Sequence, residues 1–411
     1  MRGSADVNFT MLWGNPNNIG RDRSGCKRFH LSPNIRIFLS MNPFPGKVAL
    51  VHDWLVGMRG GEKVLEVLCE LFPHATLFTL VHRAGSVAAS IERLPIRTSF
   101  IQHLPFGRSH YRYFLPLFPY AAEGLDVREF DLVISSSHAA AKGARVREGA
   151  LHVCYCHSPM RYIWDQYEQY FGAGRAPFAV RKGMNYFLAG LRRWDVETAK
   201  DVRHFIANSR AVQARILKIY GRESTVIYPP VDVSSFELSL KDDGYFLAVS
   251  ALVPYKRLDV AIEAFNRLRK RLVIVGSGPE ERALRAVAGG TIEFTGWVDE
   301  RELKRYYGGC RALIFPGVED FGIVPVEAMA CGKPVIALAK GGALETVVDG
   351  KTGVFFSDQT PESLAHAVNQ FEKIKFDGHA MRVHASQFNK EICKNRLSAL
   401  IDSVSGVAAS N

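Results

Sequence analysis

The sequence lacks several features that would assign it to well-known protein classes. It contains no run of 18 or more apolar residues, which argues against a transmembrane helix. It has no P-loop, and its nearest approach to the fingerprint G-x-G-x-x-G, Gly276-Ser277-Gly278-Pro279, lacks the third glycine. It also has no Asp-x-Asp pair, so an acidic metal clamp of that kind is missing from the chain.

Cysteine is sparse, at 7 in 411 residues, and its positions follow no regular spacing. An odd number of scattered cysteines, several inside apolar runs, is typical of core residues in a reducing compartment rather than of a disulfide framework. The cluster Cys154-x-Cys156-His157 contains metal-ligating residue types, but no second ligand pair lies at zinc spacing. We therefore predict a cytoplasmic protein without a bound metal.

The chain has a positive charge that is unevenly distributed. Its formal net charge is +11 at pH 7. Residues 1–46 contain 6 lysines and arginines against 2 acidic residues, residues 47–225 contain 24 against 16, and residues 226–411 contain 22 against 23. A basic first half favours an anionic partner such as a membrane surface, a lipid phosphate or a nucleic acid. A merely solvated basic surface explains the excess equally well.

Local patterns divide the chain into three parts. Residues 1–46 show no amphipathic period and no helix caps, so we predict a disordered extension, with Met41 as a candidate translation start. From residue 47, short apolar runs alternate with segments of helical spacing, and a linker over 225–243 separates two such series. Strands that alternate with helices indicate parallel sheets covered on both faces.

The expected strands of the first series are 47–52, 75–80, 131–135, 151–156 and 204–207, and a helix capped by Asn208 or Ser209 ends at Tyr220. Those of the second are 245–250, 271–275, 291–295, 312–315, 334–337 and 353–356, with helices near 258–268, 279–288, 299–308, 325–331, 361–372 and 380–403. We therefore predict an α/β protein of two Rossmann-like, doubly wound domains facing a cleft, over 47–225 and 226–379.

The segment from Phe315 to Ala328 carries the densest chemical signal. A short strand runs into a glycine-containing loop, and Pro325 suits the first turn of the helix that follows. The first N–H groups of a helix have no internal partners and can hold a phosphate. Glu319 precedes this helix and Glu327 is expected in its first turn, where their carboxylates could accept hydrogen bonds from sugar hydroxyls. For a lone pair of acids, solvated surface remains the commoner explanation.

Glu319-x₇-Glu327, with Phe321-Gly322 between, resembles the E-x₇-E motif of retaining glycosyltransferases with the GT-B fold, family 4. The likeness extends over about residues 47–405 and implies that a helix over 380–405 crosses back onto the first domain. It also implies a catalytic contact of Glu319 with the donor sugar and a ribose contact of Glu327. The amides of Phe321, Gly322, Ile323 and Val324 would meet the sugar and the diphosphate.

Other segments match the same family. Lys256 resembles its diphosphate-binding lysine, whereas Ala251 stands where the family commonly has an arginine, so that Arg257 is the candidate for a second charge. Gly60 and Gly61 resemble the glycine-rich loop of the first domain. Two further positions follow from the likeness: His157, as the catalytic-site histidine that contacts the donor sugar, and Val298, as part of the base pocket.

The resemblance is closest to bacterial mannosyltransferases of O-antigen and exopolysaccharide assembly, through Val51-His52-Asp53-Trp54 and Cys156-His157-Ser158-Pro159. It implies GDP-mannose as donor, a saccharide or polyprenyl-linked acceptor and no cofactor. The basic and aromatic residues 103–120 suit contact with lipid headgroups at the inner membrane face, or equally a core helix with a basic rim. An epimerase of the same fold and an inactive nucleotide-sugar-binding protein are the alternatives. We expect no nucleic-acid partner.

Overall fold

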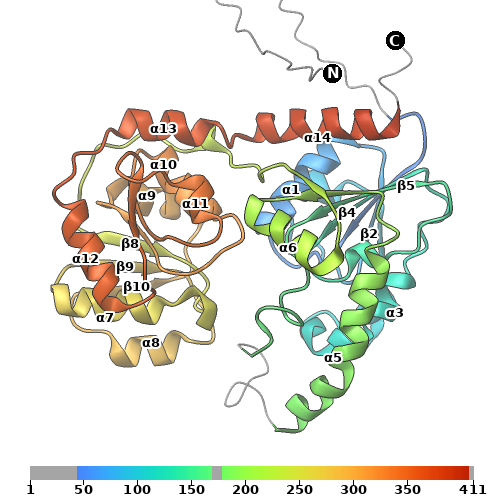
Figure 1. Cartoon of the computed structure of the whole chain (residues 1–411), viewed down its shortest axis with the longest axis horizontal. Coiled ribbons are helices and arrows are strands. Elements are labelled where there is room, and N and C mark those ends of the chain that lie inside the picture. The colour runs from blue at the N-terminus through green and yellow to red at the C-terminus, as the bar shows by residue number, and fades with distance from the viewer. Residues whose placement is uncertain (1–43, 169–177, 407–411) are drawn as a thin grey trace, which may run out of the picture. The chain divides into compact units, whose positions relative to one another are not determined.

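The computed structural model describes residues 44–168 and 178–406 (Figure 1). The expected disorder of residues 1–46 and the role of Met41 therefore concern residues almost wholly outside the described part. Within that part, no helix combines the length and the apolar character that crossing a bilayer requires. Two parallel sheets organise the described residues, which confirms the predicted α/β fold class.

The first sheet has seven strands in the order β3-β2-β1-β4-β5-β6-β7, all paired in parallel. They are β1 (Val48–His52), β2 (Thr76–Thr79), β3 (Ile96–Thr98), β4 (Leu132–Ser137), β5 (Leu151–Cys156), β6 (His204–Ala207) and β7 (Ser224–Val226). The helices around it are α1 (Gly60–Leu71), α2 (Ala89–Glu92), α3 (Phe118–Glu123), α5 (Phe178–Thr198) and α6 (Arg210–Tyr220).

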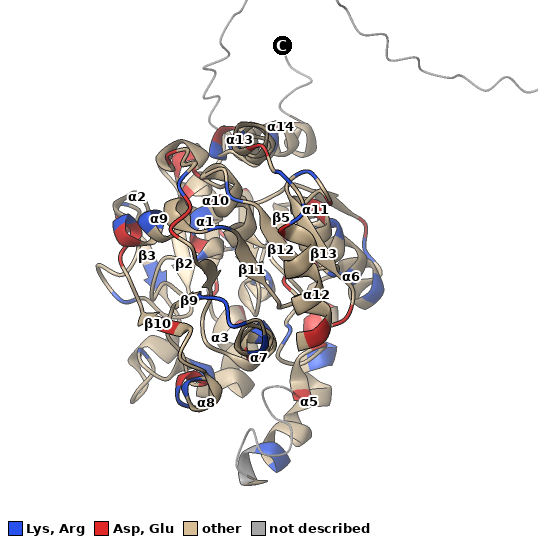
Figure 2. Ribbon diagram, turned by 90° about the vertical axis from the view of Figure 1, so that its left-hand side faces the viewer, with Lys and Arg blue, Asp and Glu red and all other residues tan. Residues whose placement is uncertain are grey.

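The second sheet has six parallel strands in the order β10-β9-β8-β11-β12-β13. They are β8 (Phe246–Val249), β9 (Leu272–Val275), β10 (Ile292–Gly296), β11 (Leu313–Phe315), β12 (Val335–Leu338) and β13 (Gly353–Phe356). The accompanying helices are α7 (Leu258–Leu268), α8 (Glu281–Val287), α9 (Glu300–Gly309), α10 (Ile323–Ala330), α11 (Ala343–Thr346), α12 (Pro361–Phe371), α13 (Gly378–Ser386) and α14 (Lys390–Ser405). Figure 2 shows that α8 carries residues of both charges.

Alternate residues of each strand enter different cores, as expected for a sheet covered on both faces. In β8, Phe246 and Ala248 pack with α7 and α12, whereas Leu247 belongs to the core with α10 and α13. In β1, Leu50 shares a core with α1, whereas Ala49 and Val51 face the opposite side. Near-continuous apolar strands are therefore the sequence signature of this architecture.

Several elements differ from the sequence-based expectation, among them the short elements β3, α2, α3 and α11, which were not predicted. The segment 380–403 belongs to two helices, because α13 ends at Ser386 and α14 begins at Lys390. Between them, Val231 N–H donates to Phe388 O at 3.0 Å, and Asn389 caps α14. The strand β7 (Ser224–Val226) includes residues 225 and 226, which were predicted to begin the linker. The long helix α5 was not predicted. α14 buries Cys393, Leu397 and Ile401 in the core that contains α1, as a return helix would.

Candidate functional site

A glycine begins helix α10 and leaves its entrance without a side-chain cap. Gly322 occupies the N-cap position with φ of +87°, a left-handed conformation that glycine adopts readily. Within the described part of the chain, no side chain caps this helix, so the N–H groups of its first turn, from Ile323 and Val324, remain suited to an anion. Because the helix starts at Ile323, Glu327 lies in its second turn, and the prediction of the first turn was wrong.

The loop that carries Glu319 lies against the loop that follows β8. A Cβ atom on Gly317 would come 3.0 Å from the Lys256 Cα, so a larger residue here would have to push the two loops apart. Lys256 forms an ion pair with Glu319, and both side chains are largely buried. Glu319 was expected at the donor sugar and Lys256 at the diphosphate. The structure brings these two residues together, and the lysine binds the carboxylate.

Glu327 is buried and holds two partners that the sequence did not indicate. The Tyr307 hydroxyl donates to its Oε2 at 2.8 Å, and the Lys63 Nζ lies 3.0 Å from its Oε1. Tyr307 comes from α9, whereas Lys63 belongs to α1 beside the first sheet. The carboxylate is therefore fixed in position before any ligand binds.

Two other predicted donor contacts have partners of their own. The Arg257 guanidinium donates to Asp259 at 2.9 Å and to Gln359 at 3.2 Å, so its role at the diphosphate stays a prediction. Phe321 is buried, with its ring 5.4 Å from those of Tyr228 and Phe388, so its backbone amide is the part suited to a ligand.

Asp320 meets two arginines that were not predicted. The Arg215 Nη1 lies 2.7 Å from its carboxylate, and the Arg161 Nη1 lies 3.4 Å from it. Both arginines come from the part of the chain that builds the first sheet. They bring positive charge next to Glu319, in a chain that has Ala251 where the family commonly has an arginine.

The first sheet contributes a cluster of polar side chains at the carboxyl ends of β1, β4 and β5. The Ser136 Oγ lies 2.8 Å from the His157 Nε2 and 3.1 Å from the His52 Nδ1. Burial lowers the pKa of His157 well below its ordinary value, and the charges of His138 and His52 act in the same direction. His157 is therefore neutral near pH 7 and suited to hydrogen bonding with a hydroxyl.

The glycine-rich loop lies directly on this cluster. A Cβ atom on Gly61 would come 3.4 Å from His52 and 3.6 Å from the His157 Nε2. One on Gly60 would come 2.9 Å from the Ile323 Cδ1, at the first turn of α10. The structure thus brings Gly60, Gly61 and His157 together near the first turn of α10, and their roles at a donor stay predictions.

A buried aspartate orients the next histidine. The Asp53 carboxylate accepts four backbone hydrogen bonds of 2.6–3.0 Å from residues 138–141 and contacts the His138 Nδ1 at 3.0 Å. Burial alone would raise the pKa of Asp53, but the charge and hydrogen bonds of His138 hold it well below its ordinary value. Burial opposes protonation of His138, yet Asp53 raises its pKa overall. Asp53 belongs to the mannosyltransferase-like segment of the sequence but had no predicted role, and His138 was not identified.

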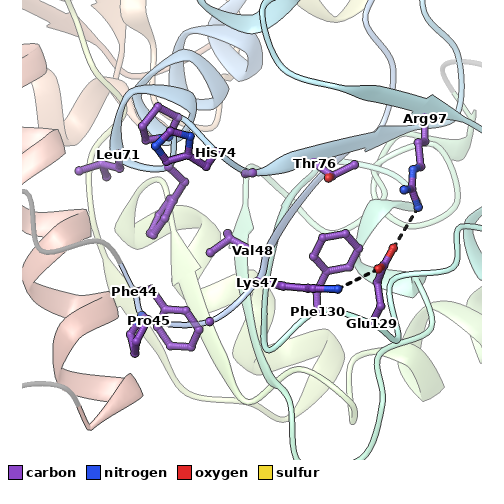
Figure 3. Close-up of a pocket in the computed structure, with 14 residues that line it drawn as sticks. Phe44, Pro45, Lys47, Val48, Leu71, His74, Thr76, Arg97, Glu129 and Phe130 are labelled. Carbon is purple, nitrogen blue, oxygen red and sulfur yellow. Dashed lines mark hydrogen bonds and ion pairs between the residues drawn. The ribbon is translucent and has the colours of Figure 1, made fainter.

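Val298 and a pocket beside the first sheet lie apart from these contacts. Val298 is half-buried against the second core, and its place at a nucleotide base stays a prediction. The pocket, of about 560 Å³, lies where β1 and β2 begin, at the opposite strand ends from His157 (Figure 3). Lys47 and Arg97 both bind Glu129 at its rim, at 3.3 and 3.1 Å.

Both sheets place their polar loops beside the strand where the order reverses. In the first sheet this is β1 with β4, and in the second it is β8 with β11. Open α/β sheets bind ligands at the carboxyl ends of strands next to such a reversal. The two sets of residues therefore occupy the positions at which this architecture forms a ligand site.

Comparisons with known proteins agree with this arrangement. Residues 59–235 match the model described as Glycosyltransferase Family 4, and residues 232–391 match the one described as Glycosyl transferases group 1. A GDP-mannose-dependent α-(1-6)-phosphatidylinositol monomannoside mannosyltransferase of Mycolicibacterium smegmatis is 32% identical over 200 residues, or 41% of this chain and 52% of that protein. An α-1,3/1,6-mannosyltransferase of Dictyostelium discoideum is 31% identical over 36% of this chain and 42% of that protein.

The chain thus spans about half the length of the curated relatives it matches. Among solved structures, Anabaena HepE in complex with UDP and glucose has a TM-score of 0.66 at 19% identity, covering 86% of this chain and 99% of that one. Sucrose-phosphate synthase of Thermosynechococcus elongatus has a TM-score of 0.65 at 18% identity, covering 89% and 100%. The two family models, the two parallel sheets and these neighbours show that the chain is a GT-B protein that belongs to glycosyltransferase family 4.

Proposed function

We propose that this protein is a retaining hexosyltransferase that moves mannose from GDP-mannose to a saccharide or polyprenyl-linked acceptor in bacterial surface polysaccharide synthesis. The observation that carries the proposal is the uncapped entrance of α10, flanked by Glu319 with its lysine and by the buried Glu327. The named mannosyltransferases among the relatives support the sugar and the donor.

In this mechanism the donor diphosphate rests on the first N–H groups of α10 and on Lys256. As the glycosidic bond to the diphosphate breaks, charge develops on the leaving phosphate, and these preorganised donors stabilise it without a metal or cofactor. Glu319 and His157 hold the transferred sugar, and Glu327 accepts hydrogen bonds from the ribose. The acceptor hydroxyl attacks from the same face and gives its proton to a leaving phosphate oxygen, so that the anomeric configuration is retained.

Under this proposal the protein acts in the cytoplasm. When its acceptor is lipid-linked, it acts at the inner face of the membrane. The basic residues of the first half would then face anionic headgroups. A thermal-shift panel of GDP, UDP and ADP sugars tests the donor. We expect GDP-mannose to give the largest increase in melting temperature, since a ligand that binds only the native state stabilises it.

Two activity assays separate the alternatives. Incubation with GDP-mannose alone would release a new sugar epimer if the protein were an epimerase. An inactive binding protein would be stabilised by the nucleotide sugar but would transfer nothing to a bacterial lipid extract. A panel in which no nucleotide sugar raises the melting temperature would contradict the proposed function.

A further inference from the structure

Three arginines surround the loops that follow β1 and β2, on the first-sheet side of the site. Arg59 is the N-cap residue of α1, Arg83 follows β2, and Arg112 lies in a 3₁₀ helix over Tyr111–Leu117. All three are exposed. Across residues 44–168 and 178–406, no ion pair involves any of them, whereas Lys63 and Lys256 both hold glutamates.

Contacts among aromatic rings join this group to the histidine cluster. The Arg112 guanidinium lies 4.9 Å from the centre of the Tyr111 ring and 6.0 Å from that of Trp54. The Trp54 ring is 4.9 Å from Tyr111 and 4.5 Å from His138, which is 6.2 Å from His157. Arg112 therefore packs on the aromatic residues that adjoin the histidine cluster. Arg59 directly precedes Gly60, which lies between this cluster and the first turn of α10.

Arg83 is held at this place by the backbone. Its N–H donates to Leu55 O at 2.8 Å, and Leu55 N–H donates to Val81 O at the same distance. Leu55 directly follows Trp54, so the loop after β2 runs beside the aromatic residues. The position of Arg83 thus depends on the main chain, and its side chain is free to be changed without removing this contact.

Tyr111 provides a buried polar atom that the protein leaves without a partner. Only 4% of the residue is exposed, and its hydroxyl is buried with no hydrogen bond among the described residues. Burying a hydroxyl unpaired costs about 1–3 kcal/mol. Such a group is rare unless a ligand or water pairs with it.

The charges of the arginines reach this hydroxyl. Burial raises the pKa of Tyr111, while the charges of Arg112, Arg59 and Arg83 lower it in part and Glu62 raises it. Glu62 is itself occupied, because it accepts from the Arg59 backbone N–H at 3.0 Å and lies 3.7 Å from the His52 Nε2. The group therefore presents hydrogen-bond donors and positive charge to any ligand, which is the complement of a phosphate.

We propose that Arg59, Arg83 and Arg112, together with the Tyr111 hydroxyl, bind a phosphate group of the acceptor. This inference rests on the proposed function, and it identifies the acceptor as a phosphate ester or diphosphate rather than a neutral saccharide. The donor diphosphate has a separate place, at Lys256 and α10. An acceptor phosphate held here would leave its sugar hydroxyl next to His157.

Isothermal titration calorimetry with inorganic pyrophosphate tests the subsite. The full chain is first saturated with GDP, so that the donor site is filled and pyrophosphate reports only a second site. We expect measurable binding, which Arg83→Gln and Arg112→Gln each weaken about tenfold, or about 1.4 kcal/mol. The matched control is Arg93→Gln, an exposed arginine of the same sheet unit, which should leave the affinity unchanged.

Tyr111→Phe separates a ligand role from a structural one. It removes the unpaired hydroxyl and keeps the ring, so the melting temperature should stay the same or rise. Pyrophosphate binding should nevertheless weaken about tenfold, because a hydrogen bond to a charged group is lost. Absence of pyrophosphate binding to the GDP complex, or unchanged affinity in Tyr111→Phe and both arginine variants, would overturn the inference.

Failure of GDP itself to bind would instead count against the proposed function. Pyrophosphate titrated into a Lys256→Ala protein without nucleotide would then still test the arginine subsite. Flotation with phosphatidylcholine vesicles, with and without phosphatidic acid, identifies the source of the phosphate. If the arginine variants lose both pyrophosphate and vesicle binding, the acceptor phosphate belongs to a lipid. If they lose pyrophosphate binding only, it belongs to a water-soluble ester.

Discussion

Glu319 and Glu327 belong to one motif but have different surroundings. Glu319 lies in the loop before α10 and forms an ion pair with Lys256. Glu327 is buried within α10 and is fixed by Tyr307 and Lys63. Under the proposed function, the loop carboxylate would contact the sugar that reacts, and the helix carboxylate would contact the ribose that only binds.

Replacing Glu319 should therefore affect turnover rather than binding. We expect Glu319→Ala to reduce kcat by about a hundredfold or more, the usual scale for loss of a group that acts in the transition state. The Kd of the nucleotide, measured by calorimetry, should stay within a few-fold of the original. Glu302→Ala, at an exposed glutamate of α9, is the control. An unchanged kcat would reject the role of Glu319.

Replacing Glu327 should have the opposite effect. Glu327→Ala removes a charged hydrogen-bond acceptor, worth about 1.5–3 kcal/mol, so the nucleotide Kd should rise by at least about tenfold. Tyr307→Phe removes only the hydroxyl that holds the carboxylate, so the Kd should rise much less. If both variants bind GDP as the unmodified protein does, Glu327 does not contact the ribose.

A buried histidine in β5 should make stability depend on pH. Burial, with the charge of Lys142, lowers the pKa of His152 to about 4, while its Nε2 contacts the Ser135 Oγ at 2.9 Å. Because the folded pKa lies below the unfolded value of about 6.5, the unfolded chain takes the proton first as pH falls. His152 thus removes about 3 kcal/mol of stability between about pH 6.5 and 4.

Urea unfolding of His152→Gln across this pH range is the measurement. The decrease in unfolding free energy with falling pH should be smaller by about 3 kcal/mol than in the unmodified protein. His74→Gln, at an exposed histidine, should leave the pH dependence unaltered. Parallel curves for the His152 variant and the unmodified protein would contradict the assignment.

At the scale of elements, the start of α10 depends on the glycine at its N-cap position. Gly322 has φ of +87°, and a Cβ atom there would meet the Phe315 ring at 3.2 Å. Gly350 has a similar φ of +70° but open space around its Cα. Substitutions at these two glycines therefore distinguish the cost of a left-handed backbone from the effect of displacing α10.

We expect Gly322→Ala and Gly350→Ala each to cost about 1–2 kcal/mol of stability for the left-handed backbone. Only Gly322→Ala should also weaken nucleotide binding, by about tenfold, because the N–H groups of the first turn must shift. Thermal unfolding and GDP titration of both variants give the comparison. Equal loss of GDP affinity in both would remove the special role of the α10 entrance.

Regular elements with strong local signals could be predicted from the sequence. The helix α6 has both its cap and its end in the sequence, because Ser209 accepts from Val212 N–H at 3.1 Å and Gly221 ends the helix with φ of +64°. The strands β3 and β7 have only three residues each and give too short a pattern. The helix α5 combines glycine and polar residues on a weakly amphipathic face, so its period was not apparent.

The candidate site was predictable only where a motif carries it. Glu319, Glu327 and His157 were identified by resemblance. The structure places the loop of Glu319, the helix of Glu327 and the segment of His157 after the carboxyl ends of strands. Tyr307 and His138 could not be identified, because their roles depend on side chains far away in the sequence that only the folded chain brings near. The domain limits, the metal independence and the absence of a cofactor stay predictions.

At the scale of the whole molecule, the described fold begins with Val48 in β1. We expect deletion of residues 1–40 to leave the melting temperature and transferase activity unchanged, since both sheets and every residue of the candidate site lie beyond it. Circular dichroism melts and a mannosyl-transfer assay on the shortened chain are the measurements. A lower melting temperature would show that the extension is structural.

The two lysine–glutamate pairs also affect how a donor arrives. A nucleotide sugar diffuses toward the protein as an anion, and bare carboxylates would slow its encounter, most of all at low ionic strength. Lys63 lies 3.0 Å from Glu327, and Lys256 contacts Glu319, so both negative charges are compensated beforehand. The two pairs themselves therefore add no net repulsion to that encounter. On binding, each lysine would exchange its carboxylate for a phosphate oxygen of the donor.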